Sequence, residues 1–120
     1  MDVLINNAGT YPPGTASQIE PAIAQEAWQV NALGAWRLAA AMVPFMCRRS
    51  WGRIVNVSSE AGSLSSMTSF MSAYNVSKAA MNAITCVLAD DLRGTGVLVN
   101  SVCPGWVRTE MGGTGGATLR

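Results

Sequence analysis

The residues best placed to do chemistry are Tyr74 and Lys78, because the chain's only lysine stands four residues after one of its two tyrosines. On a helix, residues at positions i and i+4 lie on one face with their side chains about 6 Å apart. A free tyrosine hydroxyl, with a pKa of about 10, is a poor base at pH 7, and lowering that pKa by about 3 units needs about 4 kcal/mol. A cation about 6 Å away, at an effective dielectric constant of about 20, supplies about 2.8 kcal/mol. The spacing predicts a tyrosine acid or base tuned by Lys78. The alternative is a buried tyrosine and a solvent-facing lysine that merely share a helix.

The absence of histidine excludes several other kinds of catalytic site. A Ser-His-Asp triad, a Cys-His nucleophile and imidazole-dependent metal sites all need that side chain, so no metal is expected. Acid and base chemistry near neutral pH must then use tyrosine, lysine, cysteine or a carboxylate. The cysteines Cys47, Cys86 and Cys103 are odd in number and lie far apart. They are therefore expected to be reduced, buried thiols.

Composition points to a soluble, well-packed protein of 120 residues, which is one small domain or a piece of a larger one. Hydrophobic residues make up 49% and charged residues 12%, which argues against disorder. A net charge of +1 predicts no binding to nucleic acid or to an anionic membrane. The longest apolar run, Leu38 to Cys47, is too short to span a membrane and contains Pro44. With no signal-peptide pattern at the amino end, the expected location is cytoplasmic.

The pattern of elements predicts an α/β fold. Three β-branched runs, at 3–5, 54–57 and 97–102, are nearly continuous in apolar character, which is typical of parallel strands covered on both faces. Helical spacing predicts one long helix from about Pro21 to Arg49 and another from about Ser72 to Arg93. This order of three strands and two helices is half of a doubly wound, Rossmann-type parallel sheet.

The ends and faces of these helices can also be predicted. The first helix starts either with a capping box at Ser17-x-x-Glu20 or at Pro21 with Glu20 as its cap, and the two starts differ by a turn. The second helix should end at Gly94. Its expected buried face is formed by Val76, Ala80, Ala83, Ile84, Val87 and Leu88.

Several motifs in a fixed order carry a resemblance to a known family. They are Asn6-Asn7-Ala8-Gly9 after the first strand, Asn31 in the long helix, Ser58-Ser59 closing the second strand, Tyr74-x-x-x-Lys78, and Pro104-Gly105 after the third strand. Together they resemble the short-chain dehydrogenase/reductase family over most of residues 2 to 111. The loop Gly62-Ser63-Leu64-Ser65 and the run from Cys103 to Thr109 are most similar to carbonyl-reductase-type members.

The resemblance implies four catalytic residues: Asn31, Ser59, Tyr74 and Lys78. Tyr74 would protonate a carbonyl oxygen as hydride arrives, or act as the base in the reverse direction. Lys78 would tune Tyr74 and hold the ribose hydroxyls of a nicotinamide cofactor. Ser59 would hydrogen-bond the substrate oxygen, and Asn31 would bend its helix and hold a water that relays protons to the lysine. The plainer alternatives are a strand-end serine, which is also the interpretation of Ser58, and a solvated helix asparagine.

The resemblance also implies a cofactor, with NADP(H) favoured and NAD(H) possible. Asn7, Ala8 and Gly9 would lie along it where the first strand ends, although a plain asparagine-rich turn is the alternative. The segment after the third strand would line the nicotinamide and its phosphate through Pro104, Gly105, Val107 and Thr109. Asn6 and Asn100 are expected instead to tie strand ends to neighbouring backbone.

The implied substrate is a small carbonyl compound or alcohol. The long helices would pair in a homodimer or homotetramer, and Trp28 and Trp36 would belong to the core or to this subunit interface. In the family a glycine-rich phosphate turn would precede Asp2, so the N-terminal half of the domain is expected to be missing. Residues 1–111 would form the catalytic half and residues 112–120 a flexible, glycine-rich tail. Two hypotheses follow: the catalytic half of an NAD(P)-dependent carbonyl/alcohol oxidoreductase, or an inactive α/β module that self-associates.

Overall fold

The three β-branched runs form one parallel sheet in the computed structural model, which describes residues 1–115. In spatial order the strands are β1 Val3–Asn6, β2 Gly52–Val57 and β3 Val97–Val102. Val3 lies opposite Arg53 across the first strand pair, and Gly52 lies opposite Val97 across the second. The predicted sheet of three parallel strands is confirmed.

Two long helices connect the strands. The first runs from Pro21 to Arg48 and the second from Ser72 to Asp91. The segments are α1 Pro21–Trp28, a π-helical turn η2 Gln29–Leu33, α2 Gly34–Arg48 and α3 Ser72–Asp91, with short 3-10 turns η1 Ala16–Gln18 and η3 Glu60–Gly62. Pro21 takes the first helical position after Glu20, where its missing N–H leaves no helical hydrogen bond unmade. Of the two predicted starts, the proline start is confirmed and the capping box is wrong.

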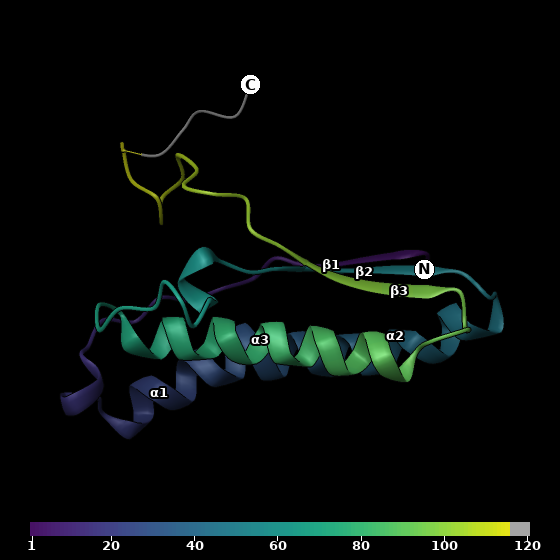
Figure 1. Ribbon diagram of the computed structural model, residues 1–120, viewed down its shortest axis with the longest axis horizontal. Helices are drawn as coiled ribbons and strands as arrows, with labels where there is room; N and C mark the ends of the chain where they lie inside the picture. Colours follow the sequence, from purple (N-terminus) through teal and green to yellow (C-terminus); the bar gives the residue numbers. More distant parts are fainter. Residues whose placement is uncertain (116–120) are drawn as a thin grey trace.

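Both long helices pack against the same face of the sheet (Figure 1). Inward-facing residues such as Ile54 and Val99 are buried. The outward face carries apolar residues that are between 44% and 60% exposed, namely Val3, Ile5, Leu98 and Val102. The prediction that both faces of the strands are covered is therefore wrong for residues 1–115. A continuous apolar run indicates that both faces of a strand can be buried. In residues 1–115, however, the two long helices cover only one face.

The buried face of α3 differs from the predicted one. Ile84 and Leu88 are buried as expected, but Val76 and Val87 are 61% and 55% exposed. Ala83 is exposed too, and Ala80 is partly buried. The helix instead turns polar and flexible residues inward, among them Ser77, Lys78, Met81 and Thr85. The spacing of apolar residues predicted the wrong buried face of α3, because the actual buried face is held by hydrogen bonds from its polar residues to β2 and η2.

A buried chain of polar side chains ties the sheet to both helices. Asn6 donates from Nδ2 to the Ala35 carbonyl of α2 at 3.3 Å and to Asn56 Oδ1 of β2 at 2.8 Å. Asn56 donates to Thr85 Oγ1 of α3 at 2.9 Å, and Thr85 donates to the Met81 carbonyl at 2.9 Å. Buried amides need hydrogen-bond partners, so these bonds favour one alignment of the layers. The expectation that Asn6 binds neighbouring backbone is confirmed.

The cysteines are reduced in the structure but are less buried than predicted. All three are free; Cys47 is partly buried, whereas Cys86 on α3 and Cys103 after β3 are exposed. The prediction of buried thiols is therefore wrong for these two. Cysteine is usually buried, but Cys86 lies on the outer side of α3 and Cys103 lies beyond the end of β3, so both are exposed.

The helix from Pro21 to Arg48 is long and apolar enough to cross a membrane by length and composition. The sequence prediction considered only the uninterrupted run from Leu38 to Cys47 and so did not identify it. Ala39 and Met46 of this helix belong to the hydrophobic core under the sheet. Core helices of soluble proteins pass the same test of length and hydropathy, and 28% of the apolar stretch of this helix is buried among the described residues.

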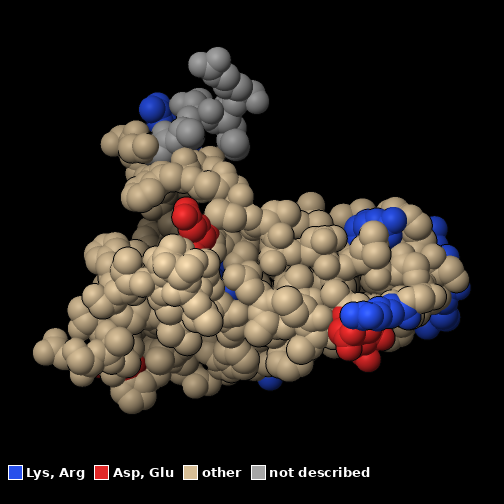
Figure 2. Space-filling view, in the orientation of Figure 1, with Lys and Arg blue, Asp and Glu red and all other residues tan. Residues whose placement is uncertain are grey.

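Charged side chains are densest at one end of the molecule, and further acidic and basic side chains lie towards the other end (Figure 2). Arg49 pairs with Asp2 at 2.8 Å, and Arg93 pairs with Asp90 at 2.9 Å. Both pairs are mainly exposed and lie near the start of the strands. Of the predicted tail, residues 116–120 lie outside the described residues; Gly112 accepts a hydrogen bond from Trp106 Nε1 at 2.7 Å.

Replacing Asn56 with alanine tests the buried polar chain. The change removes the acceptor of one Asn6 N–H and the donor to the Thr85 hydroxyl, so that only the bonds to the Ala35 and Met81 carbonyls remain. Each buried hydrogen-bonding position left unsatisfied costs about 1–3 kcal/mol. We expect the free energy of unfolding, measured by urea denaturation, to fall by about 2–4 kcal/mol. Asp90→Ala, which breaks an exposed ion pair, should change it by less than about 1 kcal/mol. Equal effects of the two substitutions on the free energy of unfolding would contradict a stabilising role of the buried hydrogen bonds of Asn56.

Candidate active site

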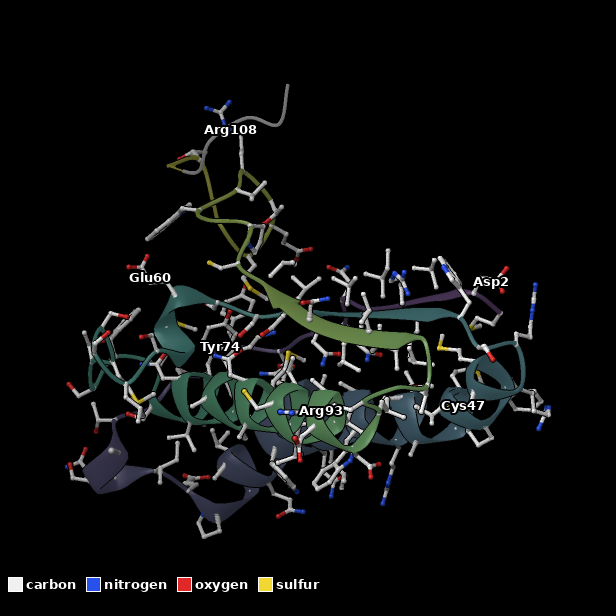
Figure 3. The ribbon with its side chains drawn as sticks, turned by 45° about the vertical axis from the view of Figure 1, so that its right-hand side comes forward. Asp2, Cys47, Glu60, Tyr74, Arg93 and Arg108 are labelled. Atoms are coloured by element: carbon white, nitrogen blue, oxygen red, sulfur yellow. The ribbon has the colours of Figure 1, made fainter. Side chains whose placement is uncertain are left out.

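The residues with predicted roles follow the carboxyl ends of the three strands. Asn7 follows β1, Ser59 follows β2 and Pro104 follows β3, and these strand ends lie at one edge of the parallel sheet. Tyr74 and Glu60 lie at this end of the molecule, whereas Asp2 and Cys47 lie at the other (Figure 3). In open α/β sheets the carboxyl ends of the strands are where ligands bind.

Lys78 is the buried charge of this end of the molecule. The residue is 4% exposed, and its Nζ donates to the Val57 carbonyl at the end of β2 at 2.8 Å. The same Nζ lies 5.6 Å from the centre of the Tyr74 ring, so the two residues do share a face of α3. Desolvation by burial lowers the pKa of the Lys78 ammonium below its usual 10.5. An ammonium has three donors, and among residues 1–115 only the bond to Val57 uses one.

Asn31 sits in the π-helical turn η2 and is completely buried. Its Oδ1 accepts from the Thr10 amide at 2.8 Å, and its Nδ2 donates to the Thr10 carbonyl at 2.7 Å. The Asn31 side chain thus binds both backbone groups of Thr10, much as a neighbouring strand would. This pair of bonds holds the segment after β1 against the long helix.

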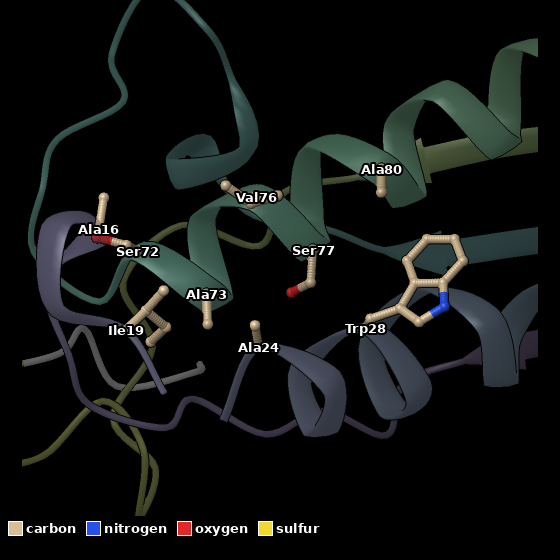
Figure 4. A pocket seen from close by; sticks show the side chains of 9 residues that line it. All are labelled: Ala16, Ile19, Ala24, Trp28, Ser72, Ala73, Val76, Ser77 and Ala80. Carbon is tan, nitrogen blue, oxygen red and sulfur yellow. The ribbon is translucent and has the colours of Figure 1, made fainter. Parts of the chain in front are cut away.

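Ser77 joins this clamp to the helix of Tyr74. Asn31 Nδ2 donates to Ser77 Oγ at 2.9 Å, and Ser77 Oγ donates to the Tyr74 carbonyl at 2.7 Å. Ser77 also lines an apolar groove of about 270 Å³ between α1 and α3, near Trp28 and Ala80, which includes neither Tyr74 nor Lys78 (Figure 4). Sequence reasoning missed Ser77; the signal available was a hydroxyl-bearing residue directly before Lys78 on the predicted helix.

Gly9 brings the end of β1 to Lys78 and Asn31. A Cβ atom at Gly9 would lie 3.4 Å from Asn31 Oδ1 and 3.7 Å from Lys78 Nζ. These are close to ordinary van der Waals distances, so the missing side chain leaves open space beside the ammonium. Asn7 and Ala8, just before it, are exposed. The predicted residues from β1, the long helix and α3 therefore meet at one place.

Ser59 follows β2 and caps the short turn η3. Its Oγ accepts from the Ala61 amide at 3.2 Å, which leaves its own O–H free to donate. Ser58 is buried, its amide donates to the Val102 carbonyl at 2.8 Å, and its Oγ is buried without a partner among the described residues. Ser59 is thus the more accessible of the two serines.

The segment after β3 lies apart from the helices. It leaves the sheet on the side opposite α2 and α3 (Figure 1). Its hydrogen bonds are internal, since Thr109 Oγ1 accepts from the Gly112 amide at 3.0 Å and Trp106 binds the Gly112 carbonyl. Pro104, Gly105 and Thr109 are exposed, and Val107 is partly buried. The structure places these four predicted residues after the end of β3, and within residues 1–115 none of them forms a hydrogen bond with Lys78 or Tyr74.

These groups together can move a proton to or from an oxygen atom. A phenol O–H can exchange a proton, a nearby ammonium favours the negative charge that the phenol oxygen then acquires, and a serine O–H can bind an oxygen on which charge develops. The buried ammonium, with two further donors, can also hold hydroxyl oxygens of a ligand.

Comparisons with known proteins agree with this arrangement. HetN, a ketoacyl reductase of Nostoc sp., is 41% identical over 107 residues, covering 89% of this chain and 37% of HetN. The structure of the carbonyl reductase Sniffer of D. melanogaster matches with a TM-score of 0.90 and 32% identity, covering 97% of this chain and 52% of Sniffer. A putative NAD(P)-dependent gluconate 5-dehydrogenase from Beutenbergia cavernae, with NADP bound at low occupancy, matches with a TM-score of 0.83 and 34% identity, covering 91% of this chain and 43% of that one.

The chain spans about half or less of the length of these relatives. A family model described as short chain dehydrogenase nevertheless matches residues 1–119, which is almost the whole chain. The order of its strands and the motifs that follow them agree with that match. The chain therefore belongs to the short chain dehydrogenase family.

Proposed function

We propose that this chain carries the catalytic residues of an NAD(P)(H)-dependent oxidoreductase that interconverts a carbonyl compound and an alcohol by hydride transfer. The observation that carries the proposal is the buried Lys78 ammonium beside the Tyr74 ring, with donors that residues 1–115 do not use. A buried cation is stabilised by oxygen acceptors, so this one favours a hydroxyl-bearing ligand. The names of two relatives, a ketoacyl reductase and a carbonyl reductase, support the reaction class.

The residues at the end of β1 fit the nicotinamide end of such a cofactor, because Gly9 leaves space beside Lys78 Nζ and Asn31 Oδ1. Lys78 would hold the ribose hydroxyls, together with Tyr74. Asn7, Ala8 and Gly9 would lie along the cofactor. Pro104, Gly105, Val107 and Thr109 would line its nicotinamide and phosphate. When bound, the cofactor supplies or accepts the hydride.

The chain's own side chains would handle the proton and the developing charge. In reduction, the Tyr74 hydroxyl gives its proton to the carbonyl oxygen, and in oxidation Tyr74 takes the proton of the alcohol. Ser59, whose Oγ already accepts from Ala61, donates its O–H to the same substrate oxygen. Lys78 stabilises the negative charge on Tyr74. Asn31 would hold the water that returns protons towards Lys78.

Several finer assignments belong to the same proposal. NADP(H) is favoured over NAD(H), supported by the carbonyl-reductase-like loops and by the NADP in the B. cavernae structure. The substrate is a small carbonyl compound or alcohol, and the location is cytoplasmic. The long helices would pair in a homodimer or homotetramer, supported by Trp36 and Leu38 of α2, which are 39% and 53% exposed. Residues 1–111 would be the catalytic part and residues 112–120 a tail.

The second candidate function is an inactive α/β module that self-associates. The exposed apolar face of the sheet, formed by Val3, Ile5, Leu98 and Val102, favours it. Exposed apolar patches on soluble proteins mark surfaces that another surface covers.

Titrating NADPH or NADH into the purified 120-residue chain separates the two functions. If the chain is active as it stands, nicotinamide fluorescence should change with saturation below millimolar cofactor, and NADPH should bind more tightly than NADH. Lys78→Met should weaken the binding of both cofactors, because it removes the donors to the ribose hydroxyls. No binding at millimolar cofactor would leave the self-associating module as the function of this chain, and analytical ultracentrifugation would then show oligomers.

Replacing Tyr74 with phenylalanine tests the acid/base role in the active enzyme. Loss of a positioned proton donor lowers rates by about 10²- to 10⁴-fold, so kcat should fall by at least about 100-fold. Cofactor binding should stay largely intact, because Lys78 keeps its donors to the ribose hydroxyls. Tyr11→Phe is the matched control, because it removes the other tyrosine hydroxyl and should leave kcat unchanged. Turnover retained in Tyr74→Phe would refute the role.

The buried ammonium also predicts a pH dependence of stability. Because burial lowers the pKa of Lys78 in the folded chain below the usual 10.5, the unfolded chain binds more protons between the folded value and 10.5. The free energy of unfolding should therefore rise, relative to Lys78→Met, as the pH increases towards 10.5, and the difference should be constant at lower pH. Urea denaturation at a series of pH values measures it, with Arg93→Met as an exposed control. A difference that stays flat throughout would contradict the burial of the charge.

A further inference from the structure

The turn that follows Ser59 packs unusually closely on the helix that carries Tyr74 and Lys78. A Cβ atom at Gly62, the last residue of η3, would lie 2.8 Å from the Lys78 carbonyl carbon and 2.9 Å from both the Ala79 amide nitrogen and Lys78 Cβ. Side-chain carbons essentially never approach heavy atoms within 3.0 Å. Two of the three atoms belong to helix backbone, which cannot turn aside as the end of a flexible side chain can. Only glycine therefore allows this contact.

The same turn determines where Ser59 lies. The Gly62 amide donates to the Ser59 carbonyl at 3.0 Å, and the Ser63 amide donates to the Glu60 carbonyl at 2.9 Å. Ser59 Oγ accepts from the Ala61 amide inside this turn. Since Ser59 is bound at both its carbonyl and its hydroxyl, it moves with η3 as one unit. Any displacement of η3 from α3 displaces the serine from Tyr74 and Lys78.

We propose that Gly62 is a positioning residue, which sets the Ser59 hydroxyl at the correct distance from Tyr74 and Lys78 by allowing η3 to rest on the backbone of α3. This inference rests on the proposed function, because Ser59 must bind the reacting oxygen for its position to matter. Catalytic groups are sensitive to such shifts, since a misplacement of about 1 Å can lower a rate about 100-fold.

The test is a double-mutant cycle in the active enzyme. Gly62→Ala should lower kcat by about 10- to 100-fold, with the cofactor Kd unchanged, because the cofactor contacts of Lys78 and Gly9 do not run through η3. In the Ser59→Ala background the same substitution should lower kcat by less than about 2-fold, because the group that it misplaces is already gone. A purely structural role of Gly62 would lower kcat equally in both backgrounds and would overturn the proposal.

Gly52→Ala is the matched control. Gly52 begins β2, at the end of the strand far from Ser59, and a Cβ there would lie 2.5 Å from the buried Met46 side chain. This variant should lose thermal stability and keep kcat. If Gly52→Ala lowers kcat as much as Gly62→Ala does, the effect comes from general destabilisation and the proposal is wrong.

Hydrogen exchange gives a readout that does not need activity. In Gly62→Ala the amides of residues 62 and 63 should exchange at least about 10-fold faster, while the Val57 and Leu92 amides keep their protection. A variant that unfolds as a whole, or that loses cofactor binding, would show that Gly62 supports the entire fold and would overturn the positioning role. The two proposals fail separately. Full turnover in Ser59→Ala and Tyr74→Phe would contradict the proposed function. Full turnover in Gly62→Ala, with turnover lost in the other two variants, would contradict only the positioning role.

Discussion

The buried ammonium of Lys78 is the constraint on which the functional end of this protein depends. A charge removed from water is strongly disfavoured unless polar groups replace the lost hydration. Here the Val57 carbonyl supplies one hydrogen bond, and the Tyr74 ring lies within the range of a cation–π contact. The bond to Val57 requires the end of β2 to lie against the first turns of α3, whereas the contact with Tyr74 forms within α3 itself. The close approach of η3 to the Lys78 backbone follows from the same requirement.

Side-chain amides hold the neighbouring elements at the matching positions. Asn31 binds the Thr10 backbone and donates its second N–H to Ser77 Oγ. The Asn31 side chain therefore connects the segment after β1 to the helix that carries Tyr74. The chain from Asn6 through Asn56 to Thr85 does the same further along the sheet. Apolar packing tolerates small slips between layers, whereas a buried hydrogen bond that loses its partner does not. These polar contacts therefore give the site its geometry, while the apolar core supplies most of the stability.

Local patterns in the sequence predict most of the fold. The β-branched runs mark all three strands, and the helices begin at Pro21 and Ser72 as expected, because these signals act within a few residues of themselves. The Tyr74 and Lys78 pairing on one helix face also follows from local spacing. The roles of Asn31 and Ser59 came from a resemblance, and the contacts that hold them were not visible in the sequence. The bonds of Asn31 to Thr10 and Ser77 join residues 21 and 46 positions apart, and no local pattern specifies such partners.

The features that could not be predicted share this long-range character. The buried stripe of α3 contains Ser77, Lys78 and Thr85, so hydropathy points away from it; only the partners on β2 and η2 make these positions interior. Gly62 shows the limit more sharply, because a glycine in a loop is expected to provide flexibility, whereas here its missing side chain makes a rigid contact with α3.

The distribution of charge follows from the same division of the molecule. Exposed ion pairs lie where the strands begin, and the single lysine is buried where they end. The paired charges at the far end are exposed and screened by water, so they contribute little field at Tyr74. Lys78 is the basic residue placed against the Tyr74 ring, so its charge would act on a phenolate there at short range and with little screening. A chain whose charges are few can for this reason still direct one buried charge at the Tyr74 ring, with the Val57 carbonyl holding the ammonium in place.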